Sequence, residues 1–161
     1  TFLLKRFVLL AAALTYKIGL ISNDRLKSIG GWLFLRGKTR DQVERSARRY
    51  ARKIVLNDVY EQYYLSVPRD ERLIISASPT TYLEELFPGE NVIGSTLSFV
   101  DSVVSGFEVN MYGEEKVRYL RSIGIFQCRR LYTDSYSDRC LMAMAMEVFL
   151  VDNGSIIRIK G

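Results

Sequence analysis

The spacing of apolar residues along the chain changes near residue 66. Before that point the spacing is helical, most clearly from Val43 to Ile54, and Thr39 or Asp41 is placed to cap that helix. After a turn at Pro68-Arg69-Asp70, short apolar runs alternate with helical patterns. The pattern predicts a helical cap over residues 1–65 and an α/β core with a parallel sheet over residues 66–161.

The first strand-and-helix unit of this core lies at Arg72–Leu86. Residues 73–75 suit a buried strand, and the small polar cluster Ser76-Ala77-Ser78-Pro79 ends it. Thr80 or Thr81 is placed to cap the helix that follows. Glu84 and Glu85 are expected in its first turn, where the helix dipole favours acidic side chains.

A second unit of the same kind lies at Arg129–Ala145. Its strand ends at Tyr132, Asp134 and Asp138 bracket the next loop, and residues 141–145 continue as a helix. Elsewhere the pattern predicts a strand at 92–93, a hairpin over 97–109 that turns at 101–102, a helix over 114–121, and strands over 147–151 and 155–159.

Ligands of open α/β sheets bind outside the carboxyl ends of the strands. We expect the strands at 73–75, 130–132 and 148–151 to be parallel neighbours in one sheet, with the 97–109 hairpin outside that set. Both polar clusters would then lie at one edge. Two carboxylates suit a hard cation, whereas hydroxyls with free backbone N–H groups suit an anion. The combination indicates phosphate chemistry assisted by Mg²⁺.

Composition narrows the chemistry further. The 161 residues carry a formal net charge of +5 and contain no histidine. The lack of histidine excludes Ser-His-Asp and Cys-His catalysis as well as histidine-bound zinc. Acid–base steps would fall to carboxylate, lysine, cysteine or tyrosine side chains. Cys128 and Cys140 are expected to be reduced thiols in a cytoplasmic protein, because two cysteines do not make a disulfide framework.

Two further stretches each allow two interpretations. The uncharged run Phe7–Tyr16 is too short to span a membrane, which takes about 20 apolar residues. We expect a buried helix there, and peripheral membrane contact through residues 1–20 is the alternative. The helix over 43–54 has a basic face that is typical of a solvated surface, and the alternative is a collar for an anionic substrate or nucleic acid. The residues of this face are Arg45, Arg48, Arg49, Arg52 and Lys53.

Several segments, taken in chain order, resemble motifs of the haloacid dehalogenase superfamily, in its phosphoserine-phosphatase-like branch with a helical cap. IISASPTTYLEELF resembles the second motif, a strand that ends in Ser or Thr. GEEKVRYLRS resembles the third motif with its lysine, and YTDSYSDRCLM resembles the fourth, an acidic pair. VIGSTLSFVDSVVSGFEV and LRGKTRDQVERSARRYA are similar to the hairpin and the last part of the cap. The resemblance covers most of the chain and implies a Rossmann-like parallel sheet.

The resemblance also implies a role for each matching residue. Ser76 and the Ala77 N–H would bind a phosphate oxygen, and Lys116 would neutralise the phosphate and the attacking carboxylate. Asp134 and Asp138 would form the metal site, with Asp134 binding Mg²⁺ directly and Asp138 holding Lys116 and the metal's waters. The implied activity is hydrolysis of a small phosphorylated substrate, a phosphomonoester, through an aspartyl-phosphate.

The chain departs from the family pattern at two points. Thr133 stands where the family commonly has glycine before the first aspartate of the fourth motif. The first motif, a strand ending in D-x-D that supplies the nucleophile and the general acid, is absent from residues 1–161. We expect this strand upstream of Thr1 in a longer protein, because it is central in the sheet and its loss would expose an unpaired edge. An inactive relative is the alternative.

Other functions stay open. One is a non-catalytic binding or scaffold module on the same fold, and another is a basic nucleic-acid-binding domain. The chain lacks the usual aromatic and basic RNA-binding motifs, so no nucleic-acid partner is expected. Taken singly, Asp138 fits a helix N-cap, Lys116 a surface charge and Ser76 a turn residue. The burial and hydrogen-bond partners of these three side chains distinguish such local roles from a shared phosphate and metal site.

Overall fold

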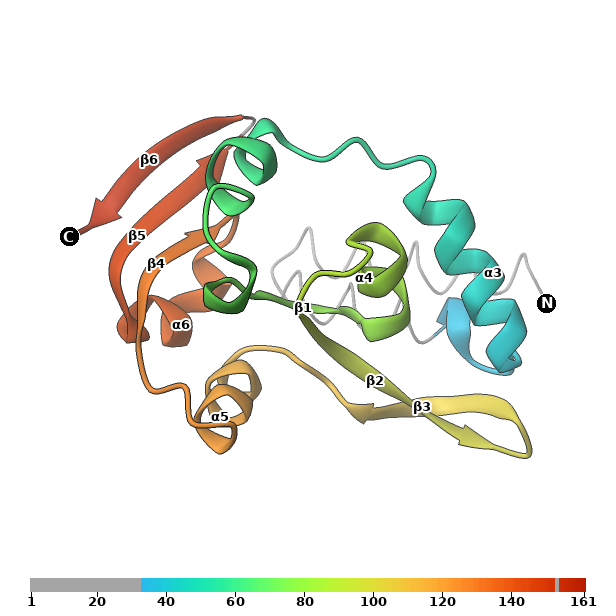
Figure 1. Cartoon of the computed structure of the whole chain (residues 1–161). Helices are drawn as coiled ribbons and strands as arrows, with labels where there is room; N and C mark the ends of the chain where they lie inside the picture. The colour runs from blue at the N-terminus through green and yellow to red at the C-terminus, as the bar shows by residue number, and fades with distance from the viewer. Residues whose placement is uncertain (1–32, 153) are drawn as a thin grey trace, which may run out of the picture. The chain divides into compact units, whose positions relative to one another are not determined.

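The computed structural model describes residues 33–152 and 154–161 (Figure 1). The helix predicted at Phe7–Tyr16 lies outside the described residues. The chain divides into two compact units, Thr1–Arg45 with Leu97–Glu108 and Ser46–Thr96 with Val109–Gly161. The predicted division into a cap over 1–65 and a core over 66–161 stays a prediction.

The strands form two three-stranded mixed sheets, so the protein is of the α/β class as predicted. One sheet has the order β1 (Ile74–Pro79), β2 (Val92–Val100) and β3 (Val103–Val109), with β1 parallel to β2. In the other sheet, β4 (Cys128–Thr133) is parallel to β5 (Ala145–Asp152), which is antiparallel to β6 (Ser155–Lys160).

The helices that accompany these strands are short. The described α-helices are α3 (Arg40–Ala51), α4 (Thr80–Leu86), α5 (Glu114–Ser122) and α6 (Arg139–Met144). Single turns of other helix types occur at η1 (Tyr60–Tyr64), η2 (Arg69–Glu71) and η3 (Tyr136–Asp138). The helices predicted over 43–54 and 114–121 therefore correspond to α3 and α5. α3 begins directly after Thr39, one of the two predicted caps, and ends earlier in the chain than predicted.

The prediction that the strands at 73–75, 130–132 and 148–151 share one sheet is wrong for the described residues. β4 and β5 are parallel neighbours as expected, whereas β1 belongs to the other sheet. β1 pairs with β2 and β4 pairs with β5, and no described strand joins the second edges of β1 and β4. The parallel pairing of β2 with β1 involves Val92, Ile93 and Ser95, which precede the hairpin predicted over 97–109. The register of this pair joins none of the hairpin residues to β1, as expected.

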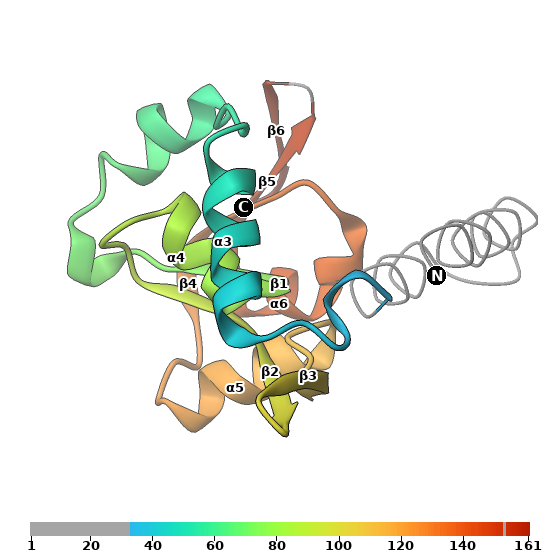
Figure 2. The same ribbon diagram turned by 90° about the vertical axis from the view of Figure 1, so that its right-hand side faces the viewer.

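The hairpin of β2 and β3 follows the local sequence. Asp101 and Ser102 both have positive φ, at 49° and 64°. Two consecutive residues of this kind make the turn whose twist suits a two-residue hairpin, and Asp is among the residues that tolerate it. The two strands run side by side in Figure 1 and Figure 2. The predicted turn at 101–102 is confirmed.

Reciprocal hydrogen bonds cap the start of α3. The Thr39 N–H donates to Gln42 Oε1 at 3.0 Å, and the Gln42 N–H donates to Thr39 Oγ1 at 3.4 Å. This exchange satisfies two backbone donors that a helix start otherwise leaves unpaired. Of the two residues proposed as caps from the sequence, Thr39 has this role.

The junction between β1 and α4 differs from the prediction. β1 continues through the small polar cluster to Pro79, which occupies the N-cap position of α4 and offers no side-chain cap. Thr80 is already helical, and its hydroxyl donates to the Ser95 carbonyl at 3.3 Å. Glu84 and Glu85 lie beyond the first turn. The fixed φ of proline, here −57°, sets the direction in which the chain enters α4, and Pro79 takes the N-cap position in place of either threonine.

Gly94 in β2 lies against the backbone of this junction. A Cβ atom at Gly94 would lie 2.6 Å from the Ser78 carbonyl oxygen and 2.8 Å from the Thr80 nitrogen. Both neighbours are backbone atoms, which cannot rotate away. The close approach of β2 to the end of β1 therefore requires glycine.

We predict that Gly94→Ala lowers the free energy of unfolding by about 1–3 kcal/mol, because the methyl group must displace the β1–α4 backbone. Urea unfolding would measure this loss. Gly106→Ala in β3 is the matched control, since its Cβ would meet only the Ser98 hydroxyl at 3.7 Å. An equal loss in both variants would contradict the clash argument.

A half-buried ion pair between Arg72 and Glu90 connects the segment after η1 to the start of the first sheet. The Arg72 guanidinium donates to both carboxylate oxygens of Glu90, at 2.9 and 2.7 Å, and also to the carbonyls of Leu65 and Val67. The side chains of Arg72 and Glu90 are 13% and 11% exposed. The hydrogen bond from Arg72 holds the pKa of the Glu90 carboxyl below its ordinary value.

Tyr64 lies beside this ion pair. The Arg72 guanidinium carbon is 5.0 Å from the centroid of the Tyr64 ring, and the Tyr64 hydroxyl is buried without a hydrogen-bond partner among the described residues. Burial first, and then the negative charge of Glu90, raise the pKa of Tyr64 to about 12. Tyr64 therefore stays neutral at any physiological pH.

The lowered pKa of Glu90 makes the stability of the fold depend on pH. Because this pKa is lower in the folded than in the unfolded chain, the pair stabilises the fold above the ordinary carboxyl value of 4.5. That contribution is lost as the pH falls through the lower folded value. We predict that Glu90→Gln lowers the urea midpoint at pH 7 and that the difference from wild type shrinks toward pH 3. Glu85→Gln, in the more exposed pair with Arg48, should change the midpoint little at either pH. A constant Glu90→Gln effect across this range would contradict the assignment.

Candidate functional site

Lys116 is a buried residue in the first turn of α5. The helix starts after Gly113, whose φ of 58° is a left-handed conformation that glycine adopts at little cost. Lys116 is only 6% exposed, and its Nζ donates to Asp138 Oδ1 at 2.6 Å. A buried ammonium group needs such a partner. Lys116 is therefore not a solvated surface charge, and the predicted contact between Lys116 and Asp138 is present.

Asp138 is at the N-cap position of α6 but does not cap the helix. Its side chain makes no hydrogen bond to the first turn of α6. One carboxylate oxygen accepts from Lys116, and the other accepts from the Thr133 hydroxyl at 3.0 Å. The interpretation of Asp138 as a mere helix cap is therefore wrong.

The loop between β4 and α6 is held by its own serine side chains. The Ser135 hydroxyl accepts from the Ser137 N–H at 3.2 Å and lies 2.8 Å from the Ser137 hydroxyl. Asp134, at the start of this loop, is exposed, and its carboxylate has no partner among residues 33–152 and 154–161. The carboxylate of Asp134 is thus available to a ligand, whereas both oxygens of Asp138 already have donors.

Ser76 and Ala77 lie in the middle of β1. The Ser76 hydroxyl accepts from the Ser78 N–H at 3.1 Å. The Ala77 carbonyl accepts from the Ser95 hydroxyl at 2.8 Å, and the same hydroxyl accepts from the Met111 N–H at 3.0 Å. In the described part of the chain, no hydrogen bond joins Ser76 to Lys116 or Asp138. The structure therefore brings together Lys116 and Asp138, and the roles predicted for Ser76 and Ala77 stay predictions.

Ser95 was not singled out from the sequence, and Thr133 was noted there only as a departure from the family pattern. Ser95 is 1% exposed, and its hydroxyl joins β1 to the segment that leads into α5 and Lys116. Thr133 is 6% exposed and joins the end of β4 to Asp138. The one available signal is a hydroxyl within a strand, and it is weak because β2 also contains Thr96 and Ser98 and β4 also contains Arg129 and Arg130. A buried hydroxyl in a strand needs a specific partner.

Of the two carboxylates predicted for the metal site, one is suited to direct contact with Mg²⁺. Residues 33–152 and 154–161 contain no group of three or more Cys, Asp or Glu side chains that could hold a metal ion. Mg²⁺ is commonly held by one or two carboxylates, with water and substrate phosphate completing the shell. The exposed Asp134 fits such direct binding. Asp138, with both oxygens already accepting hydrogen bonds, fits the role of orienting Lys116 and bound water.

The cysteines do not add a nucleophile to this site. Cys128 and Cys140 are both free, as predicted. Burial raises the pKa of the Cys128 thiol, although the positive charge of Lys160 partly offsets this. A thiol with a raised pKa is largely protonated at neutral pH and is therefore a poor nucleophile.

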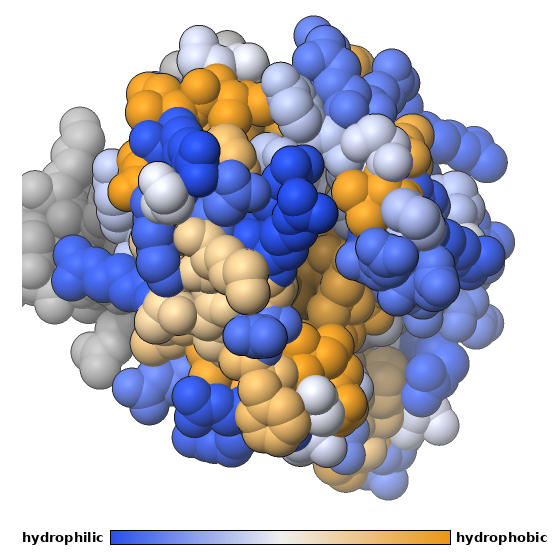
Figure 3. Space-filling view, turned by 60° about the vertical axis from the view of Figure 1, so that its left-hand side comes forward, coloured by the Kyte–Doolittle hydropathy of each residue, from blue (hydrophilic) through white to orange (hydrophobic). Residues whose placement is uncertain are grey.

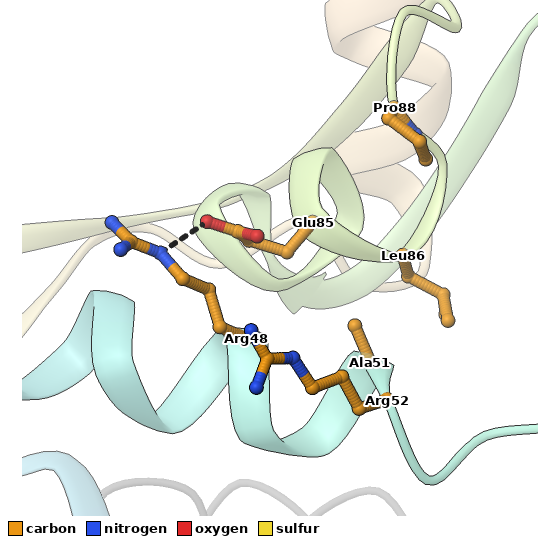
Figure 4. Close-up of a pocket in the computed structure, with 6 residues that line it drawn as sticks. All are labelled: Arg48, Ala51, Arg52, Glu85, Leu86 and Pro88. Atoms are coloured by element: carbon orange, nitrogen blue, oxygen red, sulfur yellow. Dashed lines mark hydrogen bonds and ion pairs between the residues drawn. The ribbon is translucent and has the colours of Figure 1, made fainter.

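A surface hollow of about 400 Å³ lies between the end of α3 and α4 (Figure 4). An ion pair of 3.0 Å joins Arg48 and Glu85 beside it. The lining residues are Arg48, Ala51, Arg52, Glu85, Leu86 and Pro88. None of the residues predicted for the phosphate or metal site is among them, so the hollow belongs to the basic face of α3.

Another part of the surface is apolar. The face shown in Figure 3, on the side of β4–β6 in Figure 1, has apolar patches between hydrophilic ones. Large exposed apolar residues of β5 and β6 are Met146, Ile157 and Ile159. Single exposed apolar residues are normal on protein surfaces, so these do not identify a partner.

The comparisons with known proteins add no assignment. No family model matches the sequence, and no curated protein matches it. Within the described residues, no helix is long and apolar enough to cross a membrane. The resemblance to the haloacid dehalogenase superfamily therefore depends on the motif residues and their geometry.

We predict that Lys116→Met lowers the free energy of unfolding by about 3 kcal/mol, because Asp138 would stay buried without its cation. The double variant Lys116→Met with Asp138→Leu should recover most of that loss. Arg118→Met on the same helix is the control, since Arg118 is 71% exposed and its pair with Glu115 should contribute less than about 1 kcal/mol. Equal losses for Lys116→Met and Arg118→Met, measured by urea unfolding, would show that the buried pair does not hold α5.

Proposed function

We propose that the protein is a Mg²⁺-dependent phosphomonoester phosphatase of the haloacid dehalogenase type that acts in the cytoplasm. The observation that supports this most is the buried contact between Lys116 and Asp138. Neither residue is expected to be buried if it serves only as a surface charge or a helix cap. The proposal includes a Rossmann-like core with a helical cap, and the mixed α/β fold is compatible with that core.

Each side chain has a defined task in the proposed reaction. The Lys116 ammonium group neutralises the negative charge that develops on the transferring phosphoryl group. Asp138 orients this ammonium group through the contact of 2.6 Å. Ser76 and the Ala77 N–H donate hydrogen bonds to a phosphate oxygen. Asp134 holds Mg²⁺, which when bound supplies positive charge to the phosphate oxygens.

The proposal places the nucleophile in a D-x-D segment outside residues 1–161. β1 and β4 each have one edge without a partner strand among the described residues. A parallel strand between them would satisfy the backbone N–H and C=O groups of both edges. The first aspartate of that segment would attack phosphorus while the ester P–O bond breaks, and the second would protonate the leaving oxygen. Water would then hydrolyse the aspartyl-phosphate and release inorganic phosphate.

We predict that the complete protein hydrolyses p-nitrophenyl phosphate with Mg²⁺ and that EDTA abolishes the activity. Lys116→Ala should lower kcat by about 100-fold or more, because it removes the cation at the developing charge. Arg118→Ala, on the exposed side of α5, should leave kcat unchanged within about twofold.

A polypeptide of residues 1–161 alone should be inert in the same assay, since it lacks the proposed nucleophile. Turnover by that polypeptide would refute the aspartyl-phosphate mechanism. A complete protein that is folded but inert toward a panel of phosphomonoesters would instead favour a non-catalytic binding module.

A further inference from the structure

Thr133 is the second residue that holds Asp138. It is the last residue of β4 and is paired with Leu150 of β5, so the sheet fixes its backbone. Its side chain is buried, and Oγ1 lies 3.0 Å from Asp138 Oδ2. Lys116 approaches the other oxygen, Oδ1, at 2.6 Å. The carboxylate of Asp138 is therefore held at both oxygens, by groups from two different elements.

The direction of the Thr133 hydroxyl follows from its neighbours. A hydroxyl has one proton to donate, and here it has two possible acceptors, Asp138 Oδ2 at 3.0 Å and the Ser135 carbonyl at 3.2 Å. The carboxylate is charged and nearer, so it is the stronger acceptor. The Ser135 N–H approaches Thr133 Oγ1 at 3.2 Å and uses one of its lone pairs. This arrangement directs the proton toward Asp138.

A single hydrogen bond does not fix a carboxylate, because the group can rotate about its bond to Cβ. With Lys116 alone, rotation of the Asp138 carboxylate about this bond would displace Oδ1 and, with it, the ammonium group that Oδ1 contacts. A second donor at Oδ2 removes this freedom. Small displacements of a charged group can reduce catalysis strongly, since electrostatic stabilisation depends on preorganised geometry.

We propose that Thr133 is a positioning residue that fixes the carboxylate plane of Asp138 and thereby the location of the Lys116 ammonium group. This inference rests on the proposed phosphatase function for its catalytic consequence. It does not need the metal ion, because all three side chains belong to the described structure. The threonine hydroxyl is the specific requirement, and the methyl group only fills space.

The test compares Thr133→Val, which removes the hydroxyl at nearly constant volume, with Thr133→Ser, which keeps it. In the complete protein with p-nitrophenyl phosphate, Thr133→Val should lower kcat by about 10-fold or more, with KM within about twofold, because a hydrogen bond to a charged group is lost. Thr133→Ser should keep kcat within about threefold of wild type. Ser137→Ala is the matched loop control and should behave as wild type. Within the described residues the Ser137 hydroxyl bonds only to that of Ser135, and the bond from the Ser137 N–H to the Ser135 hydroxyl is retained in this variant.

A second measurement does not depend on turnover. In ¹⁵N spectra of the complete protein, the Lys116 ammonium protons should exchange with water severalfold faster in Thr133→Val than in wild type, Thr133→Ser or Ser137→Ala. Unchanged exchange and unchanged kcat in Thr133→Val would overturn the inference. Equal loss of kcat in Thr133→Val and Thr133→Ser would also overturn it, since packing would then be the cause. If wild type shows no turnover, the proposed function fails and the exchange measurement alone decides the role of Thr133.

Discussion

The buried ion pair between Lys116 and Asp138 is the constraint on which the arrangement of the site depends. An ammonium group that is 6% exposed is tolerable only beside a carboxylate at hydrogen-bond distance. This requirement fixes the first turn of α5 against the loop after β4. Since β4 is parallel to β5 with a regular register, the position of the loop is set by the sheet. The ion pair therefore links α5 to the loop after β4.

A neutral hydrogen bond has the corresponding role at the other sheet. The Ser95 hydroxyl, nearly inaccessible to solvent, donates to the carbonyl of Ala77 and accepts from the N–H of Met111. Met111 is also buried and lies just before α5. The course of the chain into α5 thus depends on β2, while the end of α5's first turn depends on Asp138. The segment before α5 and the first turn of α5 are therefore held by two polar contacts, one from Ser95 to Met111 and one from Asp138 to Lys116.

Local elements could be predicted from the sequence, whereas their pairing could not. The hairpin turn at Asp101-Ser102 and the helix that carries Lys116 follow from residues near one another in the chain. The partition into two sheets depends on which strand edges find partners, and no local pattern encodes this. The roles of Ser95 and Thr133 could not be predicted for a similar reason, because the hydrogen-bond partner of a hydroxyl in a strand is set by the folded structure. The contact of Lys116 with Asp138 was predicted from the motif resemblance, since polarity alone would have placed the lysine in solvent.

The charges of the site indicate what kind of ligand it could accept. Lys116 and Asp138 neutralise each other, and the exposed Asp134 then leaves one negative charge. A phosphate dianion would be repelled by this arrangement, even though the whole chain has a formal net charge of +5. A divalent cation at Asp134 would reverse the local sign and make the same site attractive to phosphate. The charges of these three side chains therefore support the proposed dependence on Mg²⁺ independently of the motif resemblance.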